Sequence, residues 1–332
     1  PYASFMTGCK LILLNDVKPG ADLVPVFIEE KVTFFFGVPA VLTAVRNAIE
    51  GDKSKTDALR NNLRLVATGG TSPSPDLIAW FSRECGVELS QLWGMTELNP
   101  VGTVGRHFGS RNDINLTEEE RFQNQVVCGY PVPTVELKVV DERDMTKELP
   151  WDGKSAGILL SRGPHVCDNY LNNDGKTHFY IDQHGLKWLD TGDIAYITPK
   201  GQMQIVDRMK DVIKSGGEWI SSKELENHIY HLDKVAECCV VAIFSEKFSE
   251  RPLAVIVKKP GANLTKEEVI KHFKDAGFRK FEIPTDIQFW DELPHVGSGK
   301  LSKIQVRDTL IKQGIQLPLS VMKKHDKQKA KL

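Results

Sequence analysis

The sequence lacks the features that mark a membrane-spanning or nucleic-acid-binding protein. No apolar run among its 332 residues approaches the length of a transmembrane helix. The formal net charge is −1, so the chain as a whole does not attract a polyanion. No signal peptide is visible. The chain begins at Pro1, so we expect it to be a fragment, and the lack of a visible signal peptide then excludes no location. We therefore expect no transmembrane segment and no nucleic-acid partner.

The cysteines form no disulfide or metal pattern. All six are scattered, and none belongs to a C-x-x-C motif. Adjacent Cys238 and Cys239 cannot easily bridge to each other, and both lie in an apolar, strand-like run. This pattern favours small buried thiols in a reducing compartment over a disulfide framework. The Asn-x-Thr sequons at Asn115 and Asn263 are then chance matches.

Strand and helix patterns alternate over the first part of the chain. The expected strands are residues 10–14, 32–37, 63–68 and 87–92, and the expected helices are residues 22–31, 39–49 and 75–85. The alternation predicts an α/β layer with a mostly parallel sheet, in which 32–37 is a buried strand. Ligand sites in such sheets lie at the carboxyl ends of strands, where Gly69, Gly70 and Trp93 fall.

From residue 126 onward polar and apolar residues alternate, as in half-buried antiparallel strands. The strands expected in this β region are residues 135–140, 157–160, 187–189, 194–197 and 202–206. A compact α+β unit follows Lys210. Its expected strands are residues 237–242 and 253–257, and its expected helices are residues 222–232 and 265–276. The tail from Lys323 is basic and polar, which predicts disorder.

The most informative stretch runs from Asp207 to Ser222. It places fixed charges of both signs and one tryptophan around the pair Gly216-Gly217, directly after an apolar strand. Such a mixture is a poor design for a buried core. Glycine lets the backbone bend or approach a ligand closely, and arginine and lysine donate to phosphate, ribose or carboxylate oxygens. The stretch therefore predicts a hinge that moves charged groups into and out of a site.

Three other motifs accompany this stretch: residues 91–97 (QLWGMTE), 190–193 (DTGD) and 293–300 (LPHVGSGK). In this order and spacing the four resemble the adenylate-forming (AMP-dependent) synthetase/ligase superfamily, which includes acyl-CoA synthetases, peptide-synthetase adenylation domains and luciferases. The amino-acid sequence of residues 214–222 and 250–257 is most similar to that of medium- and long-chain fatty acyl-CoA synthetases. Each motif alone is a weak signal, whereas four in register are a strong one.

The resemblance implies a fold and a domain organisation. Residues 1–207 would be the C-terminal part of the family's large α/β domain with its β region, and residues 212–318 its small α+β C-terminal domain. Residues 208–211 would form the hinge at which the small domain rotates between two half-reactions, with Lys210 at the pivot. Residues 319–332 would be a basic tail.

The motif at residues 91–97 resembles the family's phosphate and adenine contacts. Glu97 corresponds to the glutamate that holds Mg²⁺ on the nucleotide phosphates, and carboxylate oxygen is a ligand that this hard cation prefers. Thr96 resembles the hydroxyl that contacts phosphate. Trp93, followed by Gly94, takes the position of the ring that lies against adenine. Taken alone, the motif would suit a surface glutamate beside a core tryptophan better.

Two further motifs resemble the sites for adenine and ribose. Gly69, Gly70 and Thr71 resemble the turn beside the adenine and the acyl carboxylate, although alone they would suit an ordinary turn. Asp193 resembles the aspartate that accepts hydrogen bonds from the ribose diol, and it is expected at a strand end. Arg208 resembles the arginine that also reaches the ribose.

The stretch after the expected hinge resembles the face used in the second half-reaction. Lys214, Gly216 and Gly217 correspond to residues beside which the pantetheine chain of CoA passes close to the backbone. Trp219 is expected to line the same passage. The alternative for the cations of this stretch, including Arg208 and Lys210, is a solvated basic face.

Lys300 resembles the family's loop lysine, which enters the site during adenylation. Its ammonium would neutralise charge that builds on the carboxylate and the α-phosphate. The preceding glycines do not form a P-loop, because Pro294 falls where that motif requires glycine and Leu301 replaces its Ser/Thr. The small or apolar residues expected to line the acyl pocket are Val38, Gly70, Met95 and Val101.

The resemblance implies an AMP-forming acid–thiol ligase that uses ATP, Mg²⁺ and CoA to activate a fatty acid. The alternatives are a ligase for an aryl, methylthio- or branched-chain acid, and a shortened, non-catalytic paralogue that binds nucleotide or a partner protein. The sequence lacks the family's Ser/Thr/Gly-rich loop that binds the ATP phosphates, so we expect this fragment alone to have weak catalytic activity or none.

The end of the chain carries a targeting signal by the same kind of resemblance. Ala330-Lys331-Leu332 is similar to the Ser-Lys-Leu peroxisomal address. It predicts a peroxisomal location rather than a cytoplasmic one, with the import receptor as a partner. A second copy of the chain, in a homodimer, is the remaining partner expected beside the carboxylate substrate and CoA.

Overall fold

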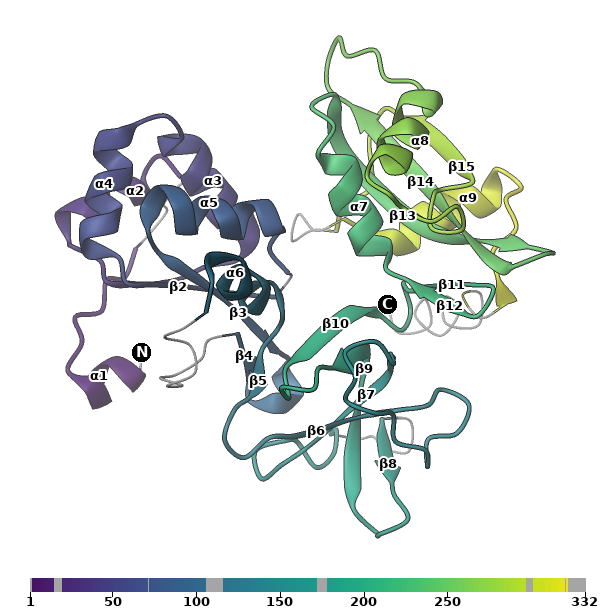
Figure 1. The fold of residues 1–332 in the computed structure, drawn as a ribbon, viewed down its shortest axis with the longest axis horizontal. Coiled ribbons are helices and arrows are strands. Elements are labelled where there is room, and N and C mark those ends of the chain that lie inside the picture. The colour runs from purple at the N-terminus through teal and green to yellow at the C-terminus, as the bar shows by residue number, and fades with distance from the viewer. Residues whose placement is uncertain are drawn as a thin grey trace. The chain divides into compact units, whose positions relative to one another are not determined.

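The computed structural model describes residues 2–14, 20–70, 72–105, 116–171, 178–296, 301–319 and 321 (Figure 1). The chain divides into two compact units, residues 1–133 and residues 134–332, and each is described by itself. Thr71, Lys300 and the terminal Ala330-Lys331-Leu332 lie outside the described residues. The hinge expected at residues 208–211 stays a prediction.

The first unit is built on a mixed sheet. Its strands, in spatial order, are β1 (Phe34–Phe36), β2 (Leu65–Gly69), β3 (Glu88–Gly94), β4 (Val101–Val104) and β5 (Tyr130–Pro131). The pairs β1/β2 and β2/β3 are parallel, and β3/β4 and β4/β5 are antiparallel. The α/β layer predicted from the alternating pattern is therefore present, and antiparallel strands extend it beyond β3.

Helices cover one face of this sheet (Figure 1). They are α2 (Leu23–Glu29), α3 (Pro39–Ile49), α4 (Lys53–Asn62) and α5 (Pro75–Cys85). Their buried side chains join Val66 of β2 and Leu89 of β3 in one apolar cluster. Two more helices, α1 (Tyr2–Thr7) and α6 (Glu118–Val126), complete the helices described in this unit.

Two expectations for the first unit are wrong. Residues 10–14 form no strand, because in the described part of the chain no strand pairs with them. The strand expected over 32–37 exists as β1, but it is not buried: Phe34 and Phe36 are more than half exposed. Among the described strands β1 pairs with β2 alone. Phe35 packs against the helix-side cluster, so Phe34 and Phe36 point to the opposite face of the sheet, where they are exposed.

The second unit begins with an antiparallel sheet. Its strands are β6 (Glu136–Val140), β7 (Gly157–Arg162), β8 (Phe179–Ile181), β9 (Lys187–Ile197) and β10 (Met203–Arg208). Their order is β10-β9-β7-β6, and β8 pairs with β9. The two strands expected at 187–189 and 194–197 are one continuous strand. Gly192 adopts a φ of +70°, and the Thr191 hydroxyl donates to Leu159 O at 2.8 Å, so β9 passes through the DTGD motif without ending.

The rest of the second unit is the predicted α+β arrangement. Its sheet has the order β12-β11-β14-β13, and β15 pairs in parallel with β14. The strands are β11 (Ile213–Ser215), β12 (Glu218–Ile220), β13 (Val235–Ser245), β14 (Ser249–Lys258) and β15 (Asp286–Trp290). The helices are α7 (Ser222–Tyr230), α8 (Lys266–Asp275) and α9 (Lys303–Lys312).

Alternation along β13 explains how these helices pack. Val240 and Ala242 belong to one buried cluster with side chains of α7 and α8. Cys239 and Val241 belong to another with side chains of α9. Because successive strand residues point to opposite faces, the sheet carries α7 and α8 on one face and α9 on the other. The apolar run around Cys238 is thus a strand, β13, with both of its faces covered by helices.

All six cysteines are free thiols, as the sequence predicts. Four of them are buried, but Cys9 is exposed and Cys167 is half-buried, so the expectation of burial is wrong for these two. Burial raises the pKa of Cys85 and of Cys239 to about 12, which keeps both thiols protonated and unreactive at neutral pH. Within the described ranges, no helix is long and apolar enough to cross a bilayer.

Candidate active site

The carboxyl end of β3 is a tight turn that requires a glycine. A Cβ atom on Gly94 would lie 2.0 Å from the backbone oxygen of Pro100, so a larger residue would push β3 and β4 apart. The next residues form a single 3-10 turn, η1 (Thr96–Leu98), in which Leu98 is fully buried. This anchor leaves Thr96 exposed and Glu97 half-buried. A hydroxyl and a carboxylate therefore stand at the strand end where parallel sheets bind ligands.

The indole of Trp93 is buried within the sheet. Only 8% of the residue is exposed, and its ring lies over Gly102, where an added Cβ atom would sit 2.3 Å from Trp93 Cζ3. The lack of a side chain at Gly102 thus leaves the room that the ring occupies. The structure gives the tryptophan a packing role between β3 and β4, and its contact with adenine stays a prediction.

The other site residues predicted in the first unit lie at the same edge. Gly69 ends β2 and pairs with Leu92 of β3. Gly70 follows with a φ of +86°, and an added Cβ atom there would lie 3.8 Å from Val38 Cγ1. Two more members of the expected acyl pocket flank the β3 end, where Met95 precedes η1 and Val101 pairs with Gly94. Sequence positions from 38 to 101 are thereby brought to one edge of the sheet.

The second unit brings together the two residues predicted to contact ribose. The register of β9 and β10 sets Asp193 opposite Arg208, and Arg208 Nε donates to Asp193 Oδ1 at 3.0 Å. The aspartate side chain is 2% exposed, whereas the arginine side chain is 48% exposed. We expected Asp193 at a strand end, but this expectation is wrong, because the residue lies inside β9. The pair places carboxylate acceptors beside guanidinium donors, which is what recognition of a diol needs.

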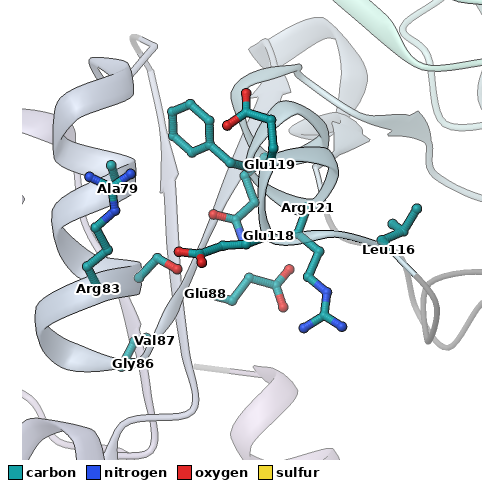
Figure 2. Close-up of a pocket in the computed structure, with 12 residues that line it drawn as sticks. Ala79, Arg83, Gly86, Val87, Glu88, Leu116, Glu118, Glu119 and Arg121 are labelled. Carbon is teal, nitrogen blue, oxygen red and sulfur yellow. The ribbon is translucent and has the colours of Figure 1, made fainter.

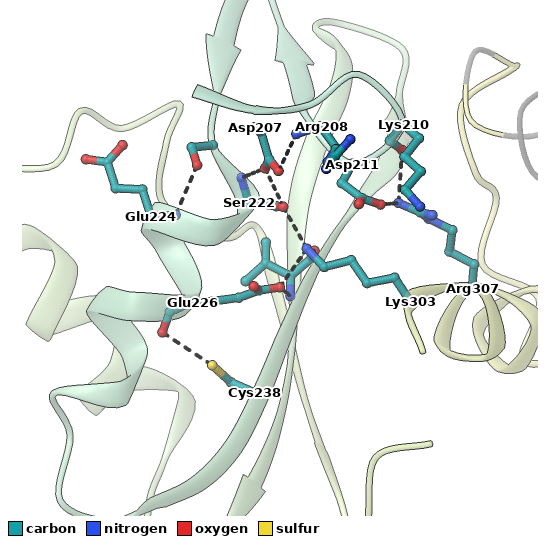
Figure 3. Close-up of polar contacts among 12 residues, drawn as sticks. Asp207, Arg208, Lys210, Asp211, Ser222, Glu224, Glu226, Cys238, Lys303 and Arg307 are labelled. Carbon is teal, nitrogen blue, oxygen red and sulfur yellow. Dashed lines mark hydrogen bonds and ion pairs between the residues drawn. The ribbon is translucent and has the colours of Figure 1, made fainter. Parts of the chain in front are cut away.

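The residues after β10 form a turn that α9 holds in place (Figure 3). The amides of Asp211 and Val212 both donate to Arg208 O, at 2.9 and 2.8 Å. Arg307 of α9 donates to Lys210 O at 3.2 Å and to Asp211 Oδ1 at 2.8 Å. Burial works against the charge of Asp211, but neighbouring cations, Arg307 among them, hold its pKa below the ordinary value. The predicted pivot, Lys210, is therefore fixed through its carbonyl.

A buried polar network lies directly behind this turn (Figure 3). Lys303 Nζ donates to Ser222 Oγ at 2.7 Å, to Val240 O at 3.2 Å and to Glu226 Oε1 at 2.8 Å. Ser222 in turn donates its amide and its hydroxyl to Asp207 Oδ2, at 2.7 and 2.6 Å. Burial opposes the charge on Lys303, yet the carboxylates of Glu226 and Asp207 hold its pKa above the ordinary value. The ammonium thus has three acceptors, which match its three protons.

Sequence reasoning missed this network together with α9. The available signal was Ser302 followed by residues 303–312: the Ser302 side chain accepts from Gln305 N at 3.4 Å and caps the helix. Lys303 and Arg307, four residues apart, lie on one face of α9 and both point inward. Charged residues at the inward positions conceal the apolar period that usually identifies a packed helix.

The hairpin of β11 and β12 positions the remaining predicted residues. Lys214 pairs with Trp219, and its Nζ lies 4.4 Å from the centre of the indole ring while forming an ion pair with Glu142. Gly216 and Gly217 are the two-residue loop, with φ of +61° and +97°. A two-residue hairpin loop with positive φ at both positions strongly favours glycine. The turn alone therefore accounts for this glycine pair, and the passage of CoA beside it stays a prediction.

A hollow of about 840 Å³ lies elsewhere in the first unit (Figure 2). It is bordered by α5, α6 and the first residue of β3, Glu88, at the opposite end of that strand from Trp93 and Glu97. Charged side chains from both helices, Arg83, Glu118 and Arg121, face it. None of the predicted nucleotide or acyl residues lines it.

Comparison with known proteins decides the family. Residues 1–171 match the AMP-binding enzyme family, and residues 224–300 match the AMP-binding enzyme C-terminal domain. The chain belongs to the AMP-binding enzyme family. Relatives of this AMP-binding enzyme include a long-chain-fatty-acid–CoA ligase of Thermus thermophilus, with 40% identity, and a medium-chain-fatty-acid–CoA ligase of Ectopseudomonas oleovorans, with 37%. Both matches cover 93% of this chain and 55% and 54% of the relatives.

A plant relative and a solved structure extend the comparison. A peroxisomal trans-cinnamate:CoA ligase of Petunia hybrida is 32% identical over 75% of this chain and 43% of its own length. The crystal structure of ATP-bound MatB from Rhodopseudomonas palustris superposes with a TM-score of 0.73 at 25% identity, covering 93% of this chain and 56% of that one. The AMP-binding enzyme described here thus spans about half the length of the relatives it matches.

Proposed function

We propose that this AMP-binding enzyme, in its full-length form, joins a fatty acid to CoA through an acyl-adenylate. A carboxylate oxygen of the acid attacks the α-phosphorus of ATP and pyrophosphate leaves. The CoA thiol then loses its proton to solvent and its sulfur attacks the acyl carbon, so that a thioester forms and AMP leaves with the electron pair of the broken C–O bond. The observation that carries the proposal is the Asp193–Arg208 pair, since two residues assigned separately to ribose are register partners in the fold.

Residues of the first unit would bind the phosphates and the acid. Thr96 and Glu97 stand at the carboxyl end of β3, and a half-buried carboxylate suits Mg²⁺, which would neutralise phosphate charge when bound. Gly69, Gly70 and Thr71 would lie beside the adenine and the reacting carboxylate. The aliphatic character of the acyl-pocket residues, Val38 among them, favours a hydrocarbon tail over a polar acid.

Residues of the second unit would serve the two half-reactions in turn. Lys300 would offset charge that develops on the carboxylate and the α-phosphate during adenylation. Lys214, with Gly216, Gly217 and Trp219, would face CoA in thioester formation. Rotation at Lys210 would exchange one lysine for the other, so that CoA enters only after pyrophosphate has left.

The proposal extends to location and partners. Ala330-Lys331-Leu332 would direct the protein to the peroxisome through the import receptor, and the peroxisomal plant relative supports this. Without a functional address the protein would remain cytoplasmic. A homodimer is proposed on the family resemblance alone.

The test is fatty-acid-dependent exchange of pyrophosphate into ATP. It is measured on this chain and on a version extended to the start codon of the gene, with acids of several chain lengths and with aryl, methylthio- and branched-chain acids. Exchange confined to the extended form, and highest with a fatty acid, supports the proposal. A highest rate with another acid class reassigns the substrate. Nucleotide binding without exchange in either form would favour the shortened, non-catalytic paralogue.

A further inference from the structure

The turn between β6 and β7 presents a carboxylate to a lysine that lies in another part of the second unit. Glu142 of this turn forms an ion pair with Lys214 of β11. The two side chains are 38% and 28% exposed, and 72 positions separate the residues in the sequence. The predicted hinge lies between them. The ion pair therefore joins the antiparallel sheet of the second unit to its α+β part.

Local hydrogen bonds fix the shape of the turn that carries Glu142. Asp141 Oδ1 accepts from the amides of Arg143 and Asp144, at 2.8 and 3.3 Å. The Asp141 amide donates to Lys147 O at 3.0 Å and closes the turn. An aspartate that accepts from amides further along its own backbone gives a turn of defined conformation. The carboxylate of Glu142 is thus held in place by its surroundings.

Lys214 is held on its other sides as well. Its amide donates to Oε2 of the buried Glu250 at 2.8 Å. Its Nζ lies 4.4 Å from the centre of the Trp219 ring, a distance at which the face of an indole attracts a cation. Trp219 and Met145, a residue of the turn, both pack against the buried apolar cluster that contains Trp188. The ion pair therefore forms between two positions that are each fixed independently.

We propose that Glu142 is a positioning residue for thioester formation, because its carboxylate competes with a substrate phosphate for the ammonium of Lys214. This inference rests on the proposed function of Lys214. A phosphate that met the ammonium in the present arrangement would lie beside the Glu142 carboxylate, and two anions at such a distance repel each other. Lys214 must therefore leave Glu142 before it can contact CoA or the acyl-adenylate, both of which carry phosphate.

The strength of the ion pair sets the size of the expected effect. A partly exposed ion pair shifts an equilibrium by at most about fivefold. An apparent affinity is reduced by the fraction of molecules whose site is ready to bind. Removing the Glu142 carboxylate should therefore raise the apparent affinity for the phosphate-bearing substrate about two- to fivefold. Adenylation should not change, because Lys300 and not Lys214 is assigned to that step.

The contact itself is measured on this chain without any reaction. Lysines are acetylated with a limiting amount of an amine-reactive reagent, and mass spectrometry compares the rate at Lys214 with that at the exposed Lys259. Glu142→Gln should raise the rate at Lys214 about two- to fivefold, since the ion pair no longer shields Nζ. The matched control Glu148→Gln, which removes an exposed carboxylate from the same β6–β7 segment, should leave the rate unchanged. An unchanged rate in Glu142→Gln would refute the shielding.

The kinetic test uses the full-length form, supplied with a fatty acyl-adenylate and CoA. In Glu142→Gln the KM of one of these substrates should fall about two- to fivefold, while pyrophosphate exchange stays normal. The substrate whose KM falls is the one whose phosphate Lys214 contacts. Lys214→Gln should slow thiolysis roughly tenfold or more, because a charge-assisted contact is lost. The double variant should match Lys214→Gln, since Glu142 acts through this lysine.

The outcomes separate this inference from the proposed function. If Lys214→Gln slows thiolysis but Glu142→Gln leaves both KM values unchanged or raises them, Glu142 does not compete and the role of Lys214 stands. If Lys214→Gln leaves thiolysis unchanged, the assigned role of Lys214 is wrong and the inference about Glu142 fails with it. An effect of Glu142→Gln that persists in the double variant would show that Glu142 acts on another group.

Discussion

Replacing Lys303 by methionine is the sharpest test of what holds the second unit together. The substitution keeps the length of the side chain but removes the ammonium, which has three acceptors, Ser222, Val240 and Glu226. It leaves the carboxylate of Glu226, whose side chain is 16% exposed, with a hydrogen bond from Val240 N at 2.8 Å and without its cation. Removing one partner of a buried ion pair costs about 3–5 kcal/mol. Because the two side chains are 18% and 16% exposed, we expect a loss near the lower end of this range at neutral pH.

The loss should depend on pH, with a sign fixed by Glu226. Burial raises the pKa of this carboxyl, and the loss of Lys303 raises it further. A group whose pKa is higher in the folded state than in the unfolded state stabilises the fold below its unfolded pKa, and that contribution is lost as pH rises through the folded pKa. The deficit of Lys303→Met should therefore be greatest near neutral pH and shrink as the pH is lowered toward the unfolded pKa of glutamate.

Urea denaturation, followed by tryptophan fluorescence at several pH values, measures this deficit. The matched control is Lys312→Met, at the exposed end of the same helix, which should change stability by no more than about 0.5 kcal/mol. The double variant Glu226→Gln/Lys303→Met should recover part of the loss, because it removes the unpaired charge while keeping an acceptor for Val240 N. A loss below about 1 kcal/mol, or a double variant less stable than Lys303→Met, would refute the reasoning.

Three other outcomes are expected. Gly129→Ala should destabilise the first unit by about 1–3 kcal/mol more than Gly51→Ala in urea denaturation. The two glycines have similar positive φ, of +88° and +84°, so backbone strain is alike in both variants. A Cβ atom on Gly129 would lie 2.0 Å from Val104 O, whereas one on Gly51 would meet no atom within 4 Å. In the full-length enzyme, Lys300→Ala should reduce adenylation at least a hundredfold while thiolysis of supplied acyl-adenylate stays within a fewfold of normal; equal losses in both assays would remove its assigned role. Lys210→Pro should spare pyrophosphate exchange and impair CoA-dependent turnover, and normal turnover would exclude a pivot there.

The sequence predicted elements best where local chemistry defines both ends. The helix expected over residues 75–85 matches α5, since Ser74 caps it, Pro75 occupies its first turn and Gly86 ends it in the left-handed region. The polar segment 53–62 gave no such signal, although it forms α4, because only two of its residues are buried. Residues 10–14 have strand-like composition, but a strand also requires a neighbour to pair with, which composition cannot reveal.

The candidate site shows the same limit. Asp193 and Arg208 were each predicted from a motif, but their contact depends on the register of β9 and β10, where a shift of one residue would turn one of them to the other face. The glycines of residues 216–217 were assigned to CoA, whereas the hairpin requires them in any case. A residue that a motif marks can serve the fold, the ligand or both, and only the structure separates these contributions.

The polar contacts around residues 208–211 also constrain how a rotation there could occur. Asp207 precedes the predicted hinge and holds Ser222 beyond it through two buried hydrogen bonds, each worth about 1.5–3 kcal/mol when a charged group takes part. The more exposed pair of Glu142 and Lys214 also spans the hinge and contributes at most about 1 kcal/mol. Rotation at Lys210 would break both contacts, so the rotated state must offer Asp207 other donors. If the Asp207–Ser222 hydrogen bonds are instead retained, the backbone must turn on the N-terminal side of Asp207. Arg208 would then move with the predicted small domain, and its ion pair with Asp193 would break.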